Sequence, residues 1–120
     1  MANLFIISDK IAERVIVQKL GSSLTKHQIT PYRLSSQHTV DWSDEAIGNY
    51  VHAHLSDIGV LIVDYDERSS AQVARNTGYT GPIVGIVTHR DDTVPGATVN
   101  FLCGTSDVDG SLEETIDALL

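Results

Sequence analysis

The sequence predicts an α/β fold in which helices cover both faces of a parallel sheet. Two short apolar runs support this prediction, Val60–Val63 and Ile83–Val87, and each is followed by a polar residue, Asp64 and Thr88. Continuous runs of β-branched and aliphatic residues are typical of strands that are buried on both faces. Strand-like and helix-like segments alternate along the chain without repeats or flexible linkers. We therefore expect a single domain over residues 1–120.

Three elements are predicted in the first third of the chain. Leu4–Ser8 has the apolar character of a first strand, and what precedes it does not resemble a signal peptide. Lys10–Leu20 is predicted to be a helix that is capped by Asp9 and ended by Gly21. Ile29–Leu34 is a weaker strand, and its proline suits an edge of the sheet. The inward residues of the helix are expected to be those at helical spacing, Ile11, Val15, Ile16 and Leu20.

The middle of the chain predicts a helix, a strand and a second helix. Ser43–Leu55 is helical in pattern, Gly59–Asp64 contains the first buried run, and Ser70–Thr77 is a short helix that ends at Gly78. The apolar face of the first of these helices comprises Ile47, Tyr50, Val51 and Leu55.

The last third contains two strands and a final helix. Pro82–Thr88 and Thr98–Leu102 are the strands, and Ser111–Glu114 has the pattern of a capping box that opens the helix. Only nine residues, His89–Ala97, join the two strands, and a full crossover needs about ten to twelve or more. The fourth helix is therefore expected to be stunted or missing. The residues of the final helix expected to face inward are Leu112, Ile116 and Leu119.

These elements predict a three-layer sandwich with five parallel strands in the order 2-1-3-4-5 and right-handed crossovers. In such sheets, functional groups lie at the carboxyl ends of the strands. Asp64 and Thr88 are therefore expected to share one edge of the sheet.

Composition narrows the classes of partner. Sixteen acidic and eight basic residues give a formal net charge of −8, and no basic face for nucleic acid is visible. No apolar run approaches the length of a membrane span. The single cysteine, Cys103, excludes an internal disulfide and fits a reducing, cytoplasmic setting. His52 and His54 are two residues apart on a predicted helix, so they point to opposite faces and do not suggest a metal pair.

Polar side chains gather where the strands of the predicted sheet end. They are Asp9, Asp64, Asp66, Thr88 and Cys103. This set resembles the pocket of the receiver domains of two-component signalling, and the resemblance covers nearly the whole chain. It implies that Asp9 is a metal-binding acid, that Asp64 is the phosphoacceptor and that Thr88 is the switch hydroxyl, with Mg²⁺ as the cofactor.

Two positions depart from the receiver pattern. Ser8 replaces the first acid of the usual pair, and Cys103 stands where receivers have a lysine. A neutral thiol cannot stabilise a phosphoryl group as a lysine does. The alternative interpretation is structural: Asp9 caps a helix and Asp64 ends a strand. The pocket is therefore expected to be vestigial.

Three further segments carry a second resemblance. Val63–Glu67 is an apolar residue followed by Asp-Tyr-Asp-Glu, Thr77–Val84 reads Thr-Gly-Tyr-Thr-Gly-Pro-Ile-Val, and Val94–Ala97 lies in the short connection before the last strand. Together they resemble the N-terminal wing domains of bacterial fold-type-I, pyridoxal-phosphate-dependent ornithine, lysine and arginine decarboxylases. These wings have a flavodoxin-like or receiver-like fold, no phosphorylation residues and an abbreviated fourth-helix region.

The wing resemblance implies a non-catalytic domain. The parent enzyme would remove the α-carboxylate of a basic amino acid with pyridoxal phosphate bound to a lysine. None of that machinery is expected in this chain, which would have no catalytic, cofactor-binding or metal-binding residues of its own. The wing would act in assembly or regulation, against the rest of the enzyme and neighbouring subunits of a homo-oligomer. The final helix runs to Leu120 without a C-cap, so we expect a domain excised from a longer chain. The alternative is an atypical receiver or pseudo-receiver in which Asp64 is a vestigial phosphoacceptor.

Overall fold

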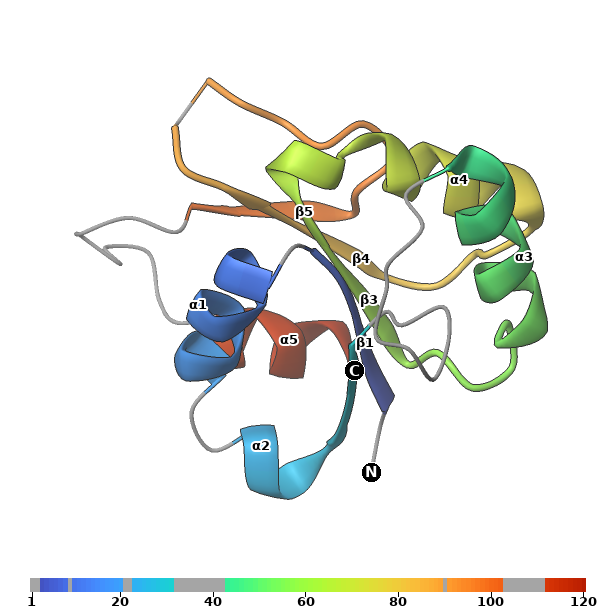
Figure 1. Ribbon diagram of the computed structural model, residues 1–120. Coiled ribbons are helices and arrows are strands. Elements are labelled where there is room, and N and C mark those ends of the chain that lie inside the picture. Colours follow the sequence, from blue (N-terminus) through green and yellow to red (C-terminus); the bar gives the residue numbers. More distant parts are fainter. Residues whose placement is uncertain (1–2, 9, 21–22, 32–42, 90, 103–111) are drawn as a thin grey trace.

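Five parallel strands form the centre of the molecule, in the order β2-β1-β3-β4-β5 (Figure 1). The computed structural model describes residues 3–8, 10–20, 23–31, 43–89, 91–102 and 112–120. It confirms the predicted α/β fold and strand order. The strands are β1 (Asn3–Ile7), β2 (Gln28–Pro31), β3 (Val60–Asp64), β4 (Ile83–Val87) and β5 (Val99–Leu102).

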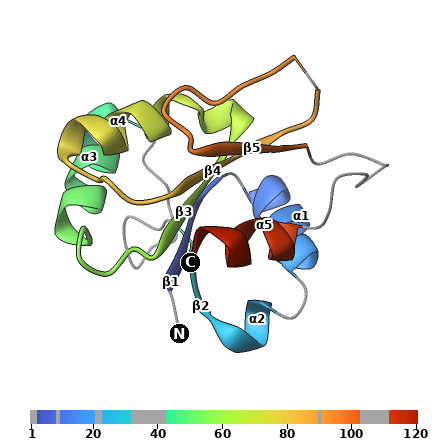
Figure 2. The same ribbon diagram turned by 180° about the vertical axis from the view of Figure 1, so that it is seen from behind.

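Helices cover both faces of this sheet, as Figures 1 and 2 show from opposite sides. α1 (Lys10–Leu20) and α5 (Leu112–Leu119) lie on one face, and α3 (Asp44–Ala53) and α4 (Ser69–Thr77) lie on the other. Successive strand residues point to opposite faces, so the sheet has two separate cores. On β1, Phe5 and Ile7 belong to the core under α3 and α4, whereas Leu4 and Ile6 belong to the core under α1 and α5.

The two apolar runs that predicted the fold are buried throughout. The hydrophobic residues of Val60–Val63 and Ile83–Val87 are at most 4% exposed, and Gly85 is buried, which confirms that β3 and β4 are central strands. Burying a side chain of this size contributes about 1.5–3 kcal/mol. The buried side chains of these two strands therefore contribute substantially to the stability of the fold.

Local capping sets the bounds of two helices: α3 is shorter than the predicted Ser43–Leu55, and α4 ends at Gly78 as predicted. Ser43 Oγ accepts a hydrogen bond from Ala46 N (3.2 Å) at the start of α3. Gly78 ends α4 in the left-handed conformation (φ 111°), which a residue with a Cβ adopts at a cost. The predicted caps Asp9, Gly21 and Ser111 lie outside the described residues.

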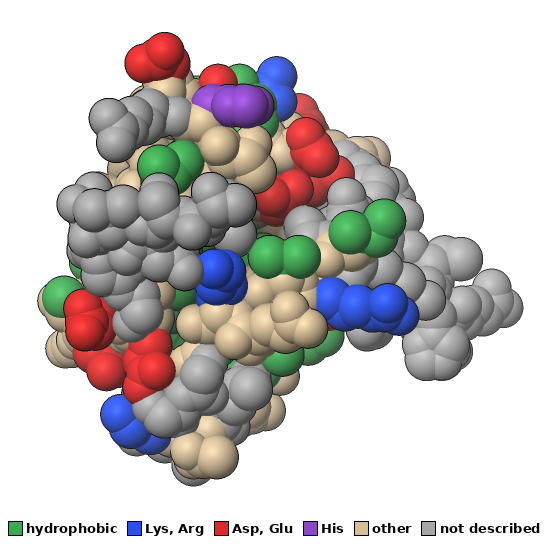
Figure 3. All heavy atoms as spheres, turned by 90° about the vertical axis from the view of Figure 1, so that its left-hand side faces the viewer, with side chains coloured by type: hydrophobic (Ala, Val, Ile, Leu, Met, Phe, Trp, Pro, Cys, Tyr) green, Lys and Arg blue, Asp and Glu red, His purple; other side chains and the backbone are tan. Residues whose placement is uncertain are grey.

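The predicted inward face of α1 is half wrong. Ile16 and Leu20 are buried, but Ile11 is 78% and Val15 39% exposed. Five residues along a helix turn it by about 140°, so Ile11 and Ile16 cannot share a face. Figure 3 shows the side of the molecule on which α1 lies, and hydrophobic side chains there form small separate groups among charged ones.

One short helix was not predicted. α2 (Ser23–Lys26) precedes β2, and its last residue lies near two acids of α5, Glu113 (3.8 Å) and Asp117 (4.0 Å). The strand expected at Ile29–Leu34 begins one residue earlier, as β2, and residues 32–34 lie outside the described part of the chain.

No helix lies between β4 and β5 in the described residues there, as the short connection predicted. We name residues 91–98 the strap. Val94 of the strap is buried and lies against Gly85 of β4, where an added Cβ would come within 2.6 Å of the Val94 side chain. The Val94 amide donates a hydrogen bond to Asn100 Oδ1 on β5 (2.8 Å). The strap therefore covers the part of the sheet that a crossover helix would otherwise cover.

Arg75 of α4 fastens the strap to its surroundings. Its Nε donates to the Gly96 carbonyl (3.0 Å), and its Nη1 donates to the carbonyls of Tyr79 (3.1 Å) and Gly81 (2.7 Å). Its Nη2 donates to Thr98 Oγ1 (3.3 Å). One side chain thus joins a helix, the loop before β4 and the end of the strap.

Among the helices that the structure describes, none is long and apolar enough to span a membrane.

We predict that Gly85→Ala lowers the free energy of unfolding by about 1–3 kcal/mol, because the new methyl group collides with Val94 and Asn100. Urea unfolding measures the loss. The double variant Gly85→Ala/Val94→Ala relieves the collision and should lose less than the sum of the two single variants. If the losses in the free energy of unfolding of the two single variants add up in the double variant, Gly85 and Val94 are not in contact.

We predict that Arg75→Ala lowers the free energy of unfolding by about 2 kcal/mol, because several carbonyl groups lose a charged donor. Arg14→Ala is the matched control, since Arg14 is exposed on α1 and should change stability by less than about 0.5 kcal/mol. Equal losses in the two variants would show that the Arg75 bonds do not fasten the strap.

Candidate functional site

The carboxyl edge of the sheet carries the described residues of the predicted pocket. Asp64 ends β3 and Thr88 follows β4, its hydrogen-bonded neighbour. The two residues therefore share one edge, as the strand order predicted. Asp64 is half-buried and Thr88 is exposed, while Ser8 after β1 is buried. The other two members of the predicted pocket, Asp9 and Cys103, lie outside the described residues.

The Asp64 carboxylate has a local structural role. Its Oδ2 accepts a hydrogen bond from the Asp66 amide (3.4 Å) and so caps the short 3-10 helix η1 (Tyr65–Glu67). Asp66 itself is exposed. This capping is the structural role expected for an aspartate that ends a strand before a helical turn.

Arg68, beside these acids, is bound within the same loop. Its guanidinium lies over the Tyr65 ring (4.4 Å to the centroid), and its Nη1 donates to the Tyr65 carbonyl (3.1 Å). Carboxylate oxygens are the ligands that Mg²⁺ prefers. Within the part of the chain that the structure describes, however, no three His, Cys, Asp or Glu side chains form a group that could hold a metal ion.

The two histidines near the end of α3 lie on different sides, as predicted. The His54 ring packs against the rings of Phe5 (5.5 Å between centroids) and Tyr50 (4.8 Å). His52 is exposed and lines a groove between α3 and α4. This pair therefore cannot hold one metal ion.

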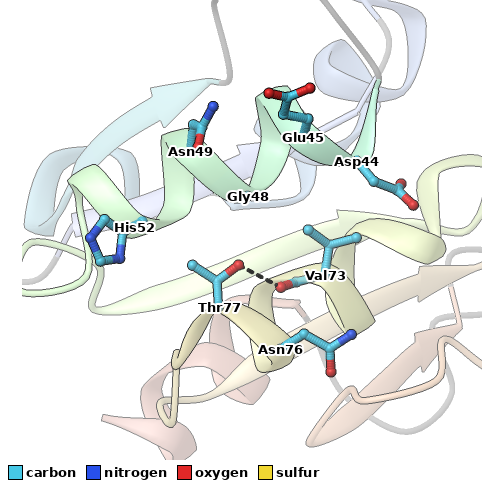
Figure 4. A pocket seen from close by; sticks show the side chains of 8 residues that line it. All are labelled: Asp44, Glu45, Gly48, Asn49, His52, Val73, Asn76 and Thr77. Carbon is cyan, nitrogen blue, oxygen red and sulfur yellow. Dashed lines mark hydrogen bonds between the residues drawn. The ribbon is translucent and has the colours of Figure 1, made fainter.

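Two hollows in the surface were not predicted from the sequence. The first lies between α3 and α4 and has a volume of about 450 Å³ (Figure 4). The spacing of Asp44, Gly48 and His52, four residues apart on one helix, was a signal that could have indicated it. The second, of about 470 Å³, lies where α3 and α4 end and is lined by Leu55, Ser56, Ile58, Gly78, Tyr79, Thr80 and Gly81.

Tyr79 in the second hollow is buried and anchors the loop before β4. Its hydroxyl donates to the Pro82 carbonyl (2.9 Å), and an added Cβ on Gly81 would lie 2.6 Å from the same hydroxyl. Burial raises the pKa of Tyr79 to about 12. A phenol with this pKa stays protonated near neutral pH, so its hydroxyl remains the donor that holds the Pro82 carbonyl.

In comparisons with known proteins, no protein-family model and no curated protein matches the chain. The sheet order and the alternating helices give it a flavodoxin-like, receiver-like topology.

We predict that stability falls as the pH rises from about 10 toward 12, because Tyr79 binds its proton more tightly in the folded state than in the unfolded state. The stabilisation from the neutral phenol is complete below the unfolded pKa of 10.0 and is lost as the pH approaches the folded pKa of about 12. Urea unfolding of the wild type and of Tyr79→Phe from about pH 10 to 12 measures the part of the stability change that comes from ionisation of Tyr79.

At pH 8 the wild type should be more stable than Tyr79→Phe by about 1 kcal/mol, the value of the hydrogen bond to Pro82. Above pH 10 the difference should shrink and then reverse. A difference that stays constant from pH 8 to pH 11 would contradict the raised pKa.

Proposed function

We propose that this domain is the wing of a pyridoxal-phosphate-dependent basic amino acid decarboxylase, with ornithine, lysine or arginine as the substrate of the parent enzyme. The domain itself contributes to assembly or regulation and performs no chemistry. Pyridoxal phosphate and the lysine that binds it belong to the remainder of the enzyme. The partners of the wing are that remainder and neighbouring subunits of a homo-oligomer, in the cytoplasm.

The observation that carries this proposal is the strap in place of the fourth helix. Val94 lies on Gly85, and Arg75 binds the strap through Gly96 and Thr98. These contacts close the face of the sheet without a crossover helix. A built-in replacement of this kind supports a wing, which is abbreviated in this region, over a receiver, which uses its fourth helix as part of an output surface.

The Thr77–Val84 motif behaves as a packing motif, which supports the same proposal. Gly78 ends α4, and Tyr79 turns back into the core and binds the Pro82 carbonyl. Arg75 binds the Gly81 carbonyl in the same loop (2.7 Å). The residues of the motif hold the start of β4 in place, a role that needs no ligand.

The native gene product provides the direct test. We expect a polypeptide several times larger than the 13.0 kDa of this chain, with the absorbance of bound pyridoxal phosphate. Mass spectrometry and an absorbance spectrum of the protein purified from its source cell measure both. A free 13.0 kDa protein without a chromophore would overturn the proposal.

An atypical receiver is the second candidate, favoured by Asp64 and Thr88 at one edge of neighbouring strands. A working receiver binds Mg²⁺ and beryllofluoride, a mimic of the phosphoryl group, beside its phosphoacceptor. A receiver should therefore bind Mg²⁺ and beryllofluoride near Asp64, and a wing domain should not.

We predict that Mg²⁺ and beryllofluoride together cause no saturable amide shifts near Asp64 and Thr88 in NMR spectra of the domain. Asp64→Asn should change only stability, by about 0.5–2 kcal/mol, because it weakens the cap of η1. Asp66→Asn is the matched control, since it removes a nearby charge and leaves the backbone amide that Asp64 binds. Saturable shifts that disappear in Asp64→Asn but persist in Asp66→Asn would establish the receiver instead.

A further inference from the structure

The groove between α3 and α4 has a polar lining, and the side chains on its α3 side take part in no contact described above. We name it the α3–α4 groove. Figure 4 shows Asp44 and His52 toward opposite ends of α3, Gly48 between them, and Val73 and Thr77 on the facing side of α4. Asp44, Gly48 and His52 recur every four residues, so they form a single stripe along α3. The eight lining residues are Asp44, Glu45, Gly48, Asn49, His52, Val73, Asn76 and Thr77.

Gly48 is unfavourable for the helix and is not required by packing. A glycine inside a helix is less stable than an alanine at the same position. An added Cβ on Gly48 would lie 3.4 Å from Thr77 Oγ1 and 3.6 Å from Val73 Cγ1, which is ordinary van der Waals contact. The glycine therefore does not serve the contact between α3 and α4, and its effect is to deepen the middle of the groove. Departures from local preference of this kind concentrate at functional sites.

The α3 side of the groove has unused hydrogen-bonding capacity. Asp44, Glu45, Asn49 and His52 are exposed, and within the described structure their side chains make no hydrogen bond or ion pair. On the α4 side, Thr77 Oγ1 donates to the Val73 carbonyl (2.8 Å). The groove can therefore accept and donate hydrogen bonds without breaking any contact of the fold.

The charged residues of the groove determine the sign of the charge that its occupant carries. The lining contains two carboxylates, Asp44 and Glu45, and no lysine or arginine. The whole chain has a net charge of −8, which also attracts a cation. Arginine and lysine have apolar stems that pack on surfaces such as Val73 and Gly48 while the charged end remains among carboxylates.

The shape of the groove favours a protein partner over a free amine. Ligand pockets bury most of the surface of a small molecule, but this groove is bounded by two helices and is lined largely by exposed side chains. The stripe from Asp44 to His52 is about 12 Å long, enough for one extended side chain and the backbone that carries it. A bound protein segment can make further contacts beyond the groove, and these contacts add to its binding energy.

We propose that the α3–α4 groove docks a basic segment of a partner protein. An arginine or lysine of that segment lies over Gly48 with its charged end at Asp44, and His52 binds the adjoining backbone, while Glu45 and Asn49 lie on the outer rim of the groove (Figure 4). This inference does not depend on the decarboxylase proposal, because it uses only the groove of this domain.

The test is an NMR titration of the full chain with a short capped peptide that contains two arginines, at low salt. Amide shifts should saturate and should concentrate on α3 and α4. The same peptide with glutamates in place of the arginines should cause no shifts. The variant Asp44→Asn/Glu45→Gln, which changes only exposed side chains, should bind the arginine peptide about tenfold more weakly.

Two further variants distinguish binding in the groove from non-specific attraction of the peptide to the acidic surface. Gly48→Leu fills the middle of the groove and should weaken binding, with unfolding curves showing that the variant is folded. Asp91→Asn/Glu114→Gln removes the same charge elsewhere and should bind as the wild type does. Shifts that do not saturate, that spread over the acidic surface, or that weaken equally in the Asp91→Asn/Glu114→Gln control would overturn the proposal.

Discussion

The contact of Val94 with the bare backbone of Gly85 determines how one face of this sheet is closed. A parallel sheet needs cover on both faces, and a crossover helix usually supplies it. Here the connection is too short for a full crossover helix, and a single buried valine fills the space that a side chain on β4 would occupy. The Val94 amide is satisfied by Asn100 Oδ1, so burying the strap leaves no unpaired donor at this point.

Arg75 extends this constraint to the rest of the α3 and α4 layer. Its guanidinium binds Gly96 and Thr98 at the end of the strap, together with the loop that starts β4. Thr98 Oγ1 in turn accepts a hydrogen bond from the Ile83 amide (3.1 Å), which fixes the first residue of β4. The position of α4, and with it one wall of the α3–α4 groove, therefore depends on the same set of contacts as the strap.

The fold could be predicted from the sequence because β3 and β4 are continuous apolar runs and because the connection after β4 is visibly short. The buried face of α1 was predicted less well: Ile11 and Val15 are apolar but exposed, whereas Ile16 is buried, and apolar character alone does not indicate which stripe faces the sheet. The role of Arg75 depends on backbone carbonyls that only the folded chain brings together. Strand order placed Asp64 and Thr88 at one edge, but sequence could not indicate that the Asp64 carboxylate caps η1, because that depends on the turn that follows β3.

Native-state hydrogen exchange of the strap tests the central claim, that the strap is a fixed layer of the fold. The amides of Val94 and Thr98 donate to Asn100 Oδ1 and to the Ile83 carbonyl, each at 2.8 Å. If the strap is fixed, both amides exchange as slowly as the amides of β4, only through global unfolding. Exchange of the Val94 and Thr98 amides at the rate of an open loop, while β4 remains protected, would show that the strap is not fixed and would contradict the account.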